Sequence, residues 1–403
     1  MSDLTTDPRL IAARAAPRRR MRLSWTDPVF RSVVWQIVIV GIVVAIAWYL
    51  IHNTNTNLAA RHIATGFGFM GRVAGIPIGE SMIQYDPAID TYGTALVIGV
   101  LNTLKVAVIG VILATILGTA IGIGRLSKNW LVAKLTAFYV ETLRDLPLLL
   151  QLLFWYTILQ GLPGPKQAWH ISDVVFLSNR GLKLPLIEWQ SAHTWVLVVF
   201  IAGFIGTILC NRRARKQQEA TGIRPGLWPV AVALLVGLPI IVWAALGAPF
   251  QIELPALKGF NFQGGLTLSP EYFALLIGLV TYTASYIAEI VRSGIQAIPL
   301  GQWEAAGALG MRPGHVLRQI VLPQAMRVII PPMTSQYLNL TKNSSLAVAI
   351  GFQDIVSIAN TTLNQTGQAI EGIAVIMGVY LTISLSISLF MNWYNARIAL
   401  VER

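Results

Sequence analysis

The residues suited to chemistry in this 403-residue chain are few and are not spaced for catalysis. A G-x-x-x-x-G-K-[ST] phosphate loop needs a Gly-Lys dipeptide, and the sequence contains none. The single G-x-G-x-x-G match, at Gly66, Gly68 and Gly71, lacks the strand–turn–helix context of a dinucleotide fold. Cys210 is the only cysteine, and the five histidines show no H-E-x-x-H spacing. We therefore expect no catalytic residue, no metal site and no internal disulfide.

The most informative segment is a predicted pair of short helices near residue 310. Gln302–Leu309 favours a helix, and Gly310 is placed to follow its end with a positive φ. Pro313 suits the first turn of a second helix, and Pro323 closes the segment. The small side chains here, which would let the backbone of another protein approach closely, are Ala305, Ala306 and Gly307. The composition therefore favours a protein contact over catalysis.

The elements that carry this segment are apolar. The chain is 55% hydrophobic and 12% charged, whereas a soluble domain is about a quarter charged. Ser32–Ala60, Trp228–Gly247 and Gly372–Ala396 contain no Asp, Glu, Lys or Arg. A helix of about 20 apolar residues satisfies its own backbone groups in lipid. We predict an all-α integral membrane protein, whose net charge of +12 lies between spans and does not indicate nucleic acid.

Hydropathy predicts about eight transmembrane helices. They lie near Val33–Ile51, Val106–Ile123, Leu146–Leu162, Thr194–Cys210, Trp228–Leu246, Tyr272–Val291, Ala325–Leu340 and Gly372–Trp393. The first is too long for a signal-peptide core and is expected to be retained. Arg327 and Pro331–Pro332 interrupt the seventh, which we expect to be kinked and to line a pathway.

The distribution of basic residues predicts the orientation. With a cytoplasmic N-terminus, 22 of the 30 Lys and Arg residues fall on the cytoplasmic side and seven on the other. This excess agrees with the positive-inside rule and places both termini in the cytoplasm. Lys105 is the remaining one, and we expect it near the outer interface, where its stem can snorkel, rather than in contact with substrate.

The segment near residue 310 resembles the EAA loop of ABC-importer permeases, whose pattern is E-A-A-x-x-x-G, nine residues, then I-x-L-P. The matching residues are Glu304, Ala305, Ala306, Gly310, Ile320, Leu322 and Pro323. The resemblance implies that this loop docks into a groove of a separate ATPase subunit, whose closure tilts the spans. ATP and Mg then belong to that partner, and this chain binds no cofactor of its own. The alternative is an ordinary helical hairpin with a glycine cap.

Four further segments resemble the polar amino acid uptake (HisMQ-like) family of permeases. They are Thr103–Val106, Tyr139–Leu148, Tyr286–Arg292 and Lys342–Leu346. Asp145 departs from the usual glycine of the second segment. Each segment also has a structural reading, since Arg144 and Asp145 could mark a helix end, and Glu289 and Arg292 are spaced as a helix-surface pair.

This resemblance covers most of Gly93–Trp393 and implies a type I ABC-importer permease fold. The expected divisions are a basic cytoplasmic arm (1–32), an extra span with a periplasmic loop (33–94), an ABC transmembrane type-1 domain (95–393) with inserted spans at about 194–246 and a cytoplasmic coupling loop at 297–324, and a cytoplasmic tail (394–403). The enlarged layout is similar to that of the larger permease subunits of general L-amino-acid importers.

The family implies a multi-pass subunit of the bacterial inner membrane that imports L-amino acids by alternating access. Its implied partners are a second, homologous permease subunit in a heterodimer, two ATP-binding subunits, a periplasmic amino-acid-binding protein and the lipid bilayer. Candidate residues of the substrate path are Tyr282, Ser285, Ser335, Tyr337, Asn339, Thr341 and Asn343. Their alternative role is interhelical hydrogen bonding.

Two other classes of function remain as alternatives. A self-contained secondary transporter or channel for small polar solutes would explain a kinked seventh span and Lys105, but it predicts polar residues deep in several spans and an inverted repeat. Neither is clear in the sequence. An intramembrane enzyme would need a nucleophile–base pair or metal ligands within the spans, and the predicted spans offer neither.

Overall fold

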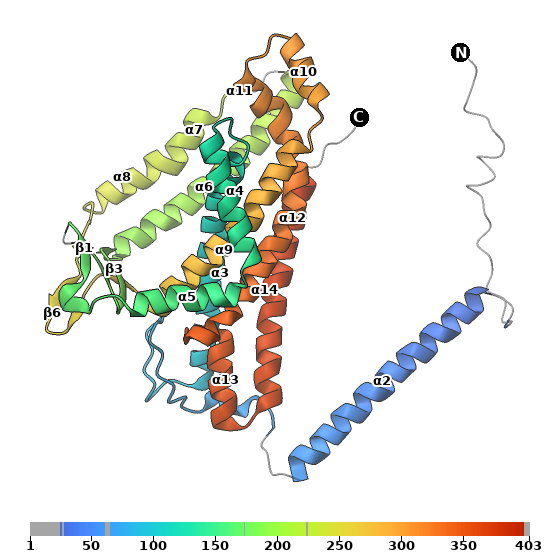
Figure 1. Ribbon diagram of the computed structural model, residues 1–403, viewed down its shortest axis with the longest axis vertical. Helices are drawn as coiled ribbons and strands as arrows, with labels where there is room; N and C mark the ends of the chain where they lie inside the picture. The colour runs from blue at the N-terminus through green and yellow to red at the C-terminus, as the bar shows by residue number, and fades with distance from the viewer. Residues whose placement is uncertain (1–24, 26–27, 61–64, 173, 223–224, 399–403) are drawn as a thin grey trace. The chain divides into compact units, whose positions relative to one another are not determined.

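The computed structural model describes Trp25 and residues 28–60, 65–172, 174–222 and 225–398 (Figure 1). Most of the predicted N-terminal arm and the end of the predicted tail lie outside these residues. Two compact units are distinguished in the chain: residues 1–67 with 364–371, and residues 68–363 with 372–403.

The first unit contains α2 (Pro28–Ala60), which carries the first predicted span. Its residues Phe30–Ala60 form a continuous helix that contains an 18-residue stretch with a mean hydropathy of 2.4. A helix of this length and composition can cross a membrane because its backbone groups pair within the segment.

The centre of the second unit is the long pairing of α3 (Tyr92–Gly124) with α9 (Pro270–Gln296). Gly118 and Gly122 in α3 form a G-x-x-x-G pattern that lets the two backbones approach closely. A Cβ added at Gly122 would lie 2.6 Å from the carbonyl oxygen of Ala288 in α9. Small residues at this seam therefore determine how closely the two helices pack.

The third predicted span, at 146–162, is not confirmed as a full crossing. Its apolar residues form α5 (Leu148–Gln160), which follows α4 (Trp130–Asp145) around a corner. Pro147 lacks an N–H and favours an extended conformation at Leu146, whose φ and ψ are −91° and 132°. The 13 residues of α5 extend about 20 Å, which is less than the roughly 30 Å of hydrocarbon in a bilayer.

The fourth and fifth predicted spans form an antiparallel helical hairpin (Figure 1). The first arm is α6 (Ser191–Thr221), and the second is α7 (Trp228–Val232), a π-helical turn (Ala233–Gly237) and α8 (Leu238–Ala245). Gly203 faces the backbone of the second arm, where an added Cβ would lie 2.3 Å from the carbonyl oxygen of Leu234. This hairpin matches the insertion predicted at about 194–246.

Short strands flank this hairpin, and the all-α prediction did not include them. They are β1 (Trp169–Ile171), β2 (Val175–Ser178), β3 (Gly181–Leu184), β4 (Leu186–Ile187), β5 (Ile252–Glu253), β6 (Ala256–Lys258), β7 (Asn261–Gln263) and β8 (Leu266–Leu268). One sheet has the antiparallel order β1-β2-β3-β8, and β4-β5 and β6-β7 are separate pairs. Leu182 lies opposite Leu268, so strands from both sides of the hairpin close into one small domain, the β-subdomain (residues 169–268 without the hairpin).

The chain after α9 continues through α10 (Leu300–Ala308), α11 (Pro313–Val316), a π-helical turn (Leu317–Val321), α12 (Leu322–Asn343), a 3₁₀ segment (Ser344–Ile350), α13 (Ile355–Thr366) and α14 (Ala369–Ile398). Pro331 and Pro332 lie inside α12, which the structure keeps as one α-helix. A bend of 52° follows at the break between Ile350 and Ile355. Gly351 allows this turn by adopting a φ of +81°.

Within the described residues, six helices are long and apolar enough to cross a membrane, or seven if the bent segment from Pro313 to Thr366 is one span. The helical membrane class is therefore confirmed, while the predicted count of eight is not. The difference is α5, the short helix at the predicted third span.

Candidate functional site

The α10–α11 hairpin (residues 300–323) has the corner expected from its glycine. Gly310 has a φ of +70° and donates its N–H to the carbonyl of Gly307 at 2.9 Å. The N–H of Met311 reaches the carbonyl of Ala306 at 3.2 Å. These two bonds form a Schellman motif, which satisfies carbonyls that a helix end otherwise leaves unpaired. Pro313 begins α11, as predicted.

The face of α10 that packs against the core includes a residue that we expected on its outer surface. Ala306 is only 1% exposed and belongs to a core cluster with Val291 of α9 and Ala325 of α12. Trp303, one turn earlier, is half-buried against the same cluster. The prediction that Ala306 presents its side chain to another protein is therefore wrong, because this residue anchors α10 to the chain's own core.

The outward face of the hairpin carries the remaining residues of the pattern. Glu304, Ala305 and Gly310 are exposed on the first half. Leu322 and Pro323 are exposed on the second half, whereas Ile320 is half-buried against the core cluster. Leu300 and Leu309 add large apolar side chains to this surface, and both are strongly exposed. We call this surface the α10 ridge, defined by Leu300, Glu304, Ala305, Gly307 and Leu309.

A charge network connects three helices just before the hairpin. Glu289 of α9 is bonded both to Arg292 of the same helix and to Arg125 at the end of α3. The Arg125 guanidinium is also 3.9 Å from Glu141 of α4. Arg144 lies over the ring of Tyr286, 5.0 Å from its centroid. The i, i+3 pair predicted for Glu289 and Arg292 is confirmed, and α4 ends at Asp145 as its helix-end reading required.

Lys105 occupies a second charged cluster, at the opposite end of α9 from the hairpin. Its ammonium pairs with Glu80, a residue of the loop before α3. The other carboxylate oxygen of Glu80 accepts a bond of 2.8 Å from Ser269, which caps α9. The ammonium also lies 4.3 Å from the ring centroid of Tyr272. Lys105 therefore has an acidic partner within the protein, which was not anticipated from the sequence, while its position near the outer interface stays a prediction.

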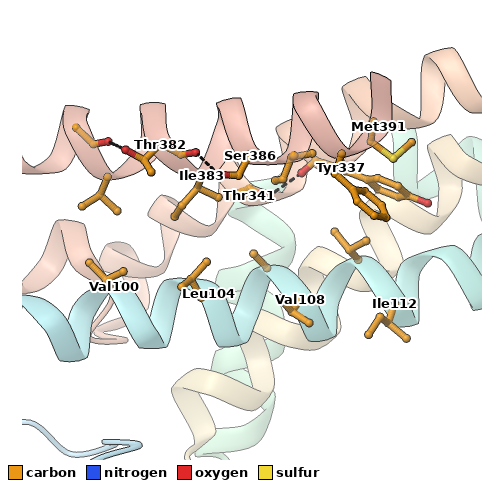
Figure 2. Close-up of a pocket in the computed structure, with 16 residues that line it drawn as sticks. Val100, Leu104, Val108, Ile112, Tyr337, Thr341, Thr382, Ile383, Ser386 and Met391 are labelled. Atoms are coloured by element: carbon orange, nitrogen blue, oxygen red, sulfur yellow. Dashed lines mark hydrogen bonds between the residues drawn. The ribbon is translucent and has the colours of Figure 1, made fainter. Parts of the chain in front are cut away.

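The candidate path residues do not form one site. Tyr337 and Thr341 of α12 line a groove of about 680 Å³ between α3 and α14 (Figure 2). The other walls of this groove are mostly aliphatic, with Val100 and Leu104 on α3 and Ile383 on α14. A groove with so few polar groups is suited to lipid or another apolar surface more than to a polar solute.

The remaining candidates lie elsewhere or bond locally. The Ser285 hydroxyl is buried and donates to the carbonyl of Tyr282 at 2.6 Å. Ser335 and Asn339 are exposed on α12, and Asn343 is half-buried at its end. One candidate makes an interhelical hydrogen bond instead: between α3 and α12, the Thr115 hydroxyl donates to the Tyr337 hydroxyl at 3.0 Å.

Sequence reasoning missed Arg125, Glu80 and the buried Lys183 of β3, each of which the fold gives a specific partner. Arg125 stands at the border of the apolar run 93–124, which was a signal in the sequence, whereas no pattern distinguished Glu80 or Lys183. Across the described ranges, no group of three or more His, Cys, Asp or Glu residues is arranged to hold a metal ion.

These features describe a multi-pass helical membrane protein with an exposed helical hairpin next to a charge network. Residues 226–400 match the family model for a binding-protein-dependent transport system inner membrane component. The match begins just before α7 and covers α9, the α10–α11 hairpin and α12 to α14. The hairpin that carries the E-A-A pattern therefore lies inside the matched region.

Three curated relatives extend this likeness over nearly the whole chain. The general L-amino acid transport system permease protein AapQ of Rhizobium johnstonii is 49% identical over 95% of this chain and 96% of its own length. The putative amino-acid ABC transporter permease protein YhdX of Escherichia coli is 49% identical, covering 94% and 97%. BztB of Rhodobacter capsulatus, a glutamate/glutamine/aspartate/asparagine transport system permease protein, is 42% identical, covering 96% and 98%. The chain belongs to this family of inner-membrane ABC transporter permeases.

A solved amino acid ABC transporter with histidines shares 19% identity with this chain. It covers 76% of this chain and 95% of its own, with a TM-score of 0.45.

Proposed function

We propose that this chain is the permease subunit of an ATP-driven importer of L-amino acids in the bacterial inner membrane. The observation that carries the proposal is the exposed E-A-A hairpin in a chain that matches amino-acid permeases over almost its full length. The substrate class comes from these relatives, whose names specify L-amino acids or particular members of that class.

The α10 ridge is the proposed docking surface for a separate ATPase subunit. Its small residues allow close approach, and Leu300 and Leu309 offer apolar side chains that a groove would bury. ATP and Mg are bound by that partner, and this chain holds neither. The full complex contains two ATP-binding subunits, a second homologous permease in a heterodimer and a periplasmic amino-acid-binding protein.

The anchoring of α10 supports a mechanical role for the hairpin. Ala306, Val316 and Val321 of the hairpin share one core cluster with Val291 of α9 and Ala325 of α12. A displacement of α10 would therefore be transmitted to α9 and α12, since packed interiors resist compression. Closure of the ATPases would in this way tilt the helices between inward-facing and outward-facing states.

The test replaces Glu304 on the ridge. Glu304→Lys is expected to abolish uptake and co-purification of the ATPase while the protein stays in the membrane, because it reverses a charge at the docking surface. Glu219→Lys, the same change at an exposed site near the end of α6, is the matched control and is expected to keep both properties. Gly310→Pro is expected to match Glu304→Lys, since proline cannot adopt a φ of +70°. Normal uptake by Glu304→Lys with bound ATPase would show that the docking assignment is wrong.

A further inference from the structure

A polar pocket of about 520 Å³ lies where the β-subdomain meets the helical core. Gln160 at the end of α5, Arg180 in the β2–β3 turn and Lys183 in β3 form part of its lining. Thr267 of β8, paired with Lys183 in the sheet, and Glu271 in the first turn of α9 also line the pocket. The volume is typical of sites for small molecules, but the walls are polar where such sites are usually apolar. Five separate elements therefore bring charged and amide groups together in one small space.

Lys183 is the least expected group in this pocket. It is 6% exposed, and its ammonium bonds to the hydroxyl of Thr267. Within the described part of the chain, no carboxylate lies within ion-pair distance of it. Burial lowers the pKa of Lys183, because removal from water penalises its charged form. A buried ammonium held only by a hydroxyl is poorly compensated, and a bound anion would supply the missing charge.

Two further groups point to a ligand that also carries a positive charge. The Glu271 carboxylate accepts a bond of 3.1 Å from the Tyr156 hydroxyl, which in turn accepts one of 2.5 Å from Gln160. These bonds fix the carboxylate and leave it further acceptor positions. The Oδ1 atom of Asn179 is buried, with no hydrogen-bond partner among the described residues. Both oxygens could accept bonds from an ammonium group.

We propose that this pocket binds a free dicarboxylic amino acid, with its two carboxylates at Arg180 and Lys183 and its ammonium at Glu271. Two cations and one carboxylate are the charge complement of a molecule with two carboxylates and one ammonium. The choice of an amino acid rests on the proposed function. The site itself lies at the other end of α9 from the α10–α11 hairpin and needs neither ATP nor the ATPase.

An acidic side chain of a docked protein could present one carboxylate to the same cations. The free amino acid is favoured because an acidic side chain carries no ammonium of its own for Glu271, and because the pocket has room for a whole small molecule. The two sources share carboxylate recognition, so the experiment must separate them.

The experiment measures binding of radiolabelled L-glutamate to the full transporter complex in nanodiscs, without the binding protein and without ATP. Saturable binding is expected, and Arg180→Gln and Lys183→Met are each expected to weaken it about tenfold or more, the loss of roughly one strong charged contact. Lys183→Arg keeps the charge and should retain most of the affinity. Lys258→Gln, an exposed site in β6 outside the pocket, is the matched control and should bind like the unaltered protein.

Competition assigns the ammonium partner. Glutarate has two carboxylates and no ammonium, so it should displace radiolabelled L-glutamate only weakly from the unaltered protein. In Glu271→Gln the ammonium has no carboxylate partner, so the affinities of glutarate and L-glutamate should be closer to each other. Absence of saturable binding, or equal binding by Arg180→Gln and the control, would overturn the proposal. If free L-glutamate does not bind and the variants lose only their association with the binding protein, the occupant is an acidic side chain of that protein, and the proposal is also overturned. Uptake by the same complexes with binding protein and ATP tests the proposed function separately, since Arg180→Gln can lose this site and still transport.

Discussion

Lys105 and Lys183 are both withdrawn from water, and they differ in what surrounds the ammonium. Lys105 meets the carboxylate of Glu80, so its charge is balanced inside the protein. Among the described residues, Lys183 bonds only to the hydroxyl of Thr267, and no carboxylate there balances its charge. A polar group that is buried with its partner contributes to structure, whereas one that is buried without a partner indicates a function or a ligand.

Removal of one member of the Lys105–Glu80 pair should therefore cost stability. Glu80→Gln leaves the ammonium beside a neutral amide and is expected to lower the free energy of unfolding by about 2 kcal/mol, the usual scale for a hydrogen bond to a charged group. Thermal unfolding of the purified permease in detergent measures the effect.

The double variant Lys105→Gln with Glu80→Gln provides the control. Because both charges are then absent, its loss of stability should be clearly smaller than the sum of the two single losses. Strict additivity would mean that the two side chains do not interact in the native protein.

At the scale of elements, two glycines determine how closely α3 packs against α9. The G-x-x-x-G pattern at Gly118 and Gly122 brings α3 against Ala284 and Ala288 of α9. Glycine normally weakens a helix by about 1 kcal/mol relative to alanine. It is retained here because a methyl group would occupy space already filled by the neighbouring backbone.

Gly122→Ala is thus expected to destabilise the protein by about 1–3 kcal/mol through overpacking, despite its better helix propensity. Gly378→Ala in α14 is the matched control, since a Cβ there meets nothing within 4 Å, and it should be neutral or slightly stabilising. The melting temperatures of the two variants in detergent measure these changes in stability. Equal shifts would mean that the seam can relax to accept the extra methyl group.

The elements also differ in how far the sequence predicts them. Seven of the eight predicted spans lie within long helices or within the bent segment, because an uninterrupted apolar run has few other stable forms in lipid. The third predicted span began at the corner beside Pro147, and its apolar residues were mistaken for a full crossing although they form a helix of only 13 residues. The strands have two to four residues each, too few for alternation to be detected, and their pairing across the inserted hairpin is non-local.

The α10–α11 hairpin was predictable where local geometry dominates. Gly310 and Pro313 each have a conformation that their residue types favour, and both were placed correctly. The inward position of Ala306 was also encoded, since Trp303 and Ala306 are spaced i, i+3 on one helix face. The Lys183 pocket could not be predicted, because it forms only when β3, β8 and α9 meet in the tertiary structure.

At the scale of the whole molecule, α9 predicts how the parts of the second unit are distributed across the membrane. α9 begins two residues after β8 and ends just before α10, and its 27 residues extend about 40 Å. A helix of this length crosses the bilayer once, so the β-subdomain and the α10–α11 hairpin belong on opposite sides. The charge distribution predicts a cytoplasmic hairpin, and the β-subdomain is then expected in the periplasm.

Single-cysteine labelling tests this arrangement, because Cys210 is the only cysteine to remove. In a Cys210→Ser background, Lys258→Cys in β6 should react with a membrane-impermeant maleimide in intact spheroplasts, since this exposed site is expected to face the periplasm. Arg318→Cys, an exposed site in the α10–α11 hairpin, should react only after permeabilisation, and the Cys210→Ser parent should not react at all. Reaction of Arg318→Cys in intact spheroplasts would show that the orientation is opposite to the predicted one. The α10 ridge would then be unavailable to a cytoplasmic ATPase, whatever its fit to the E-A-A pattern.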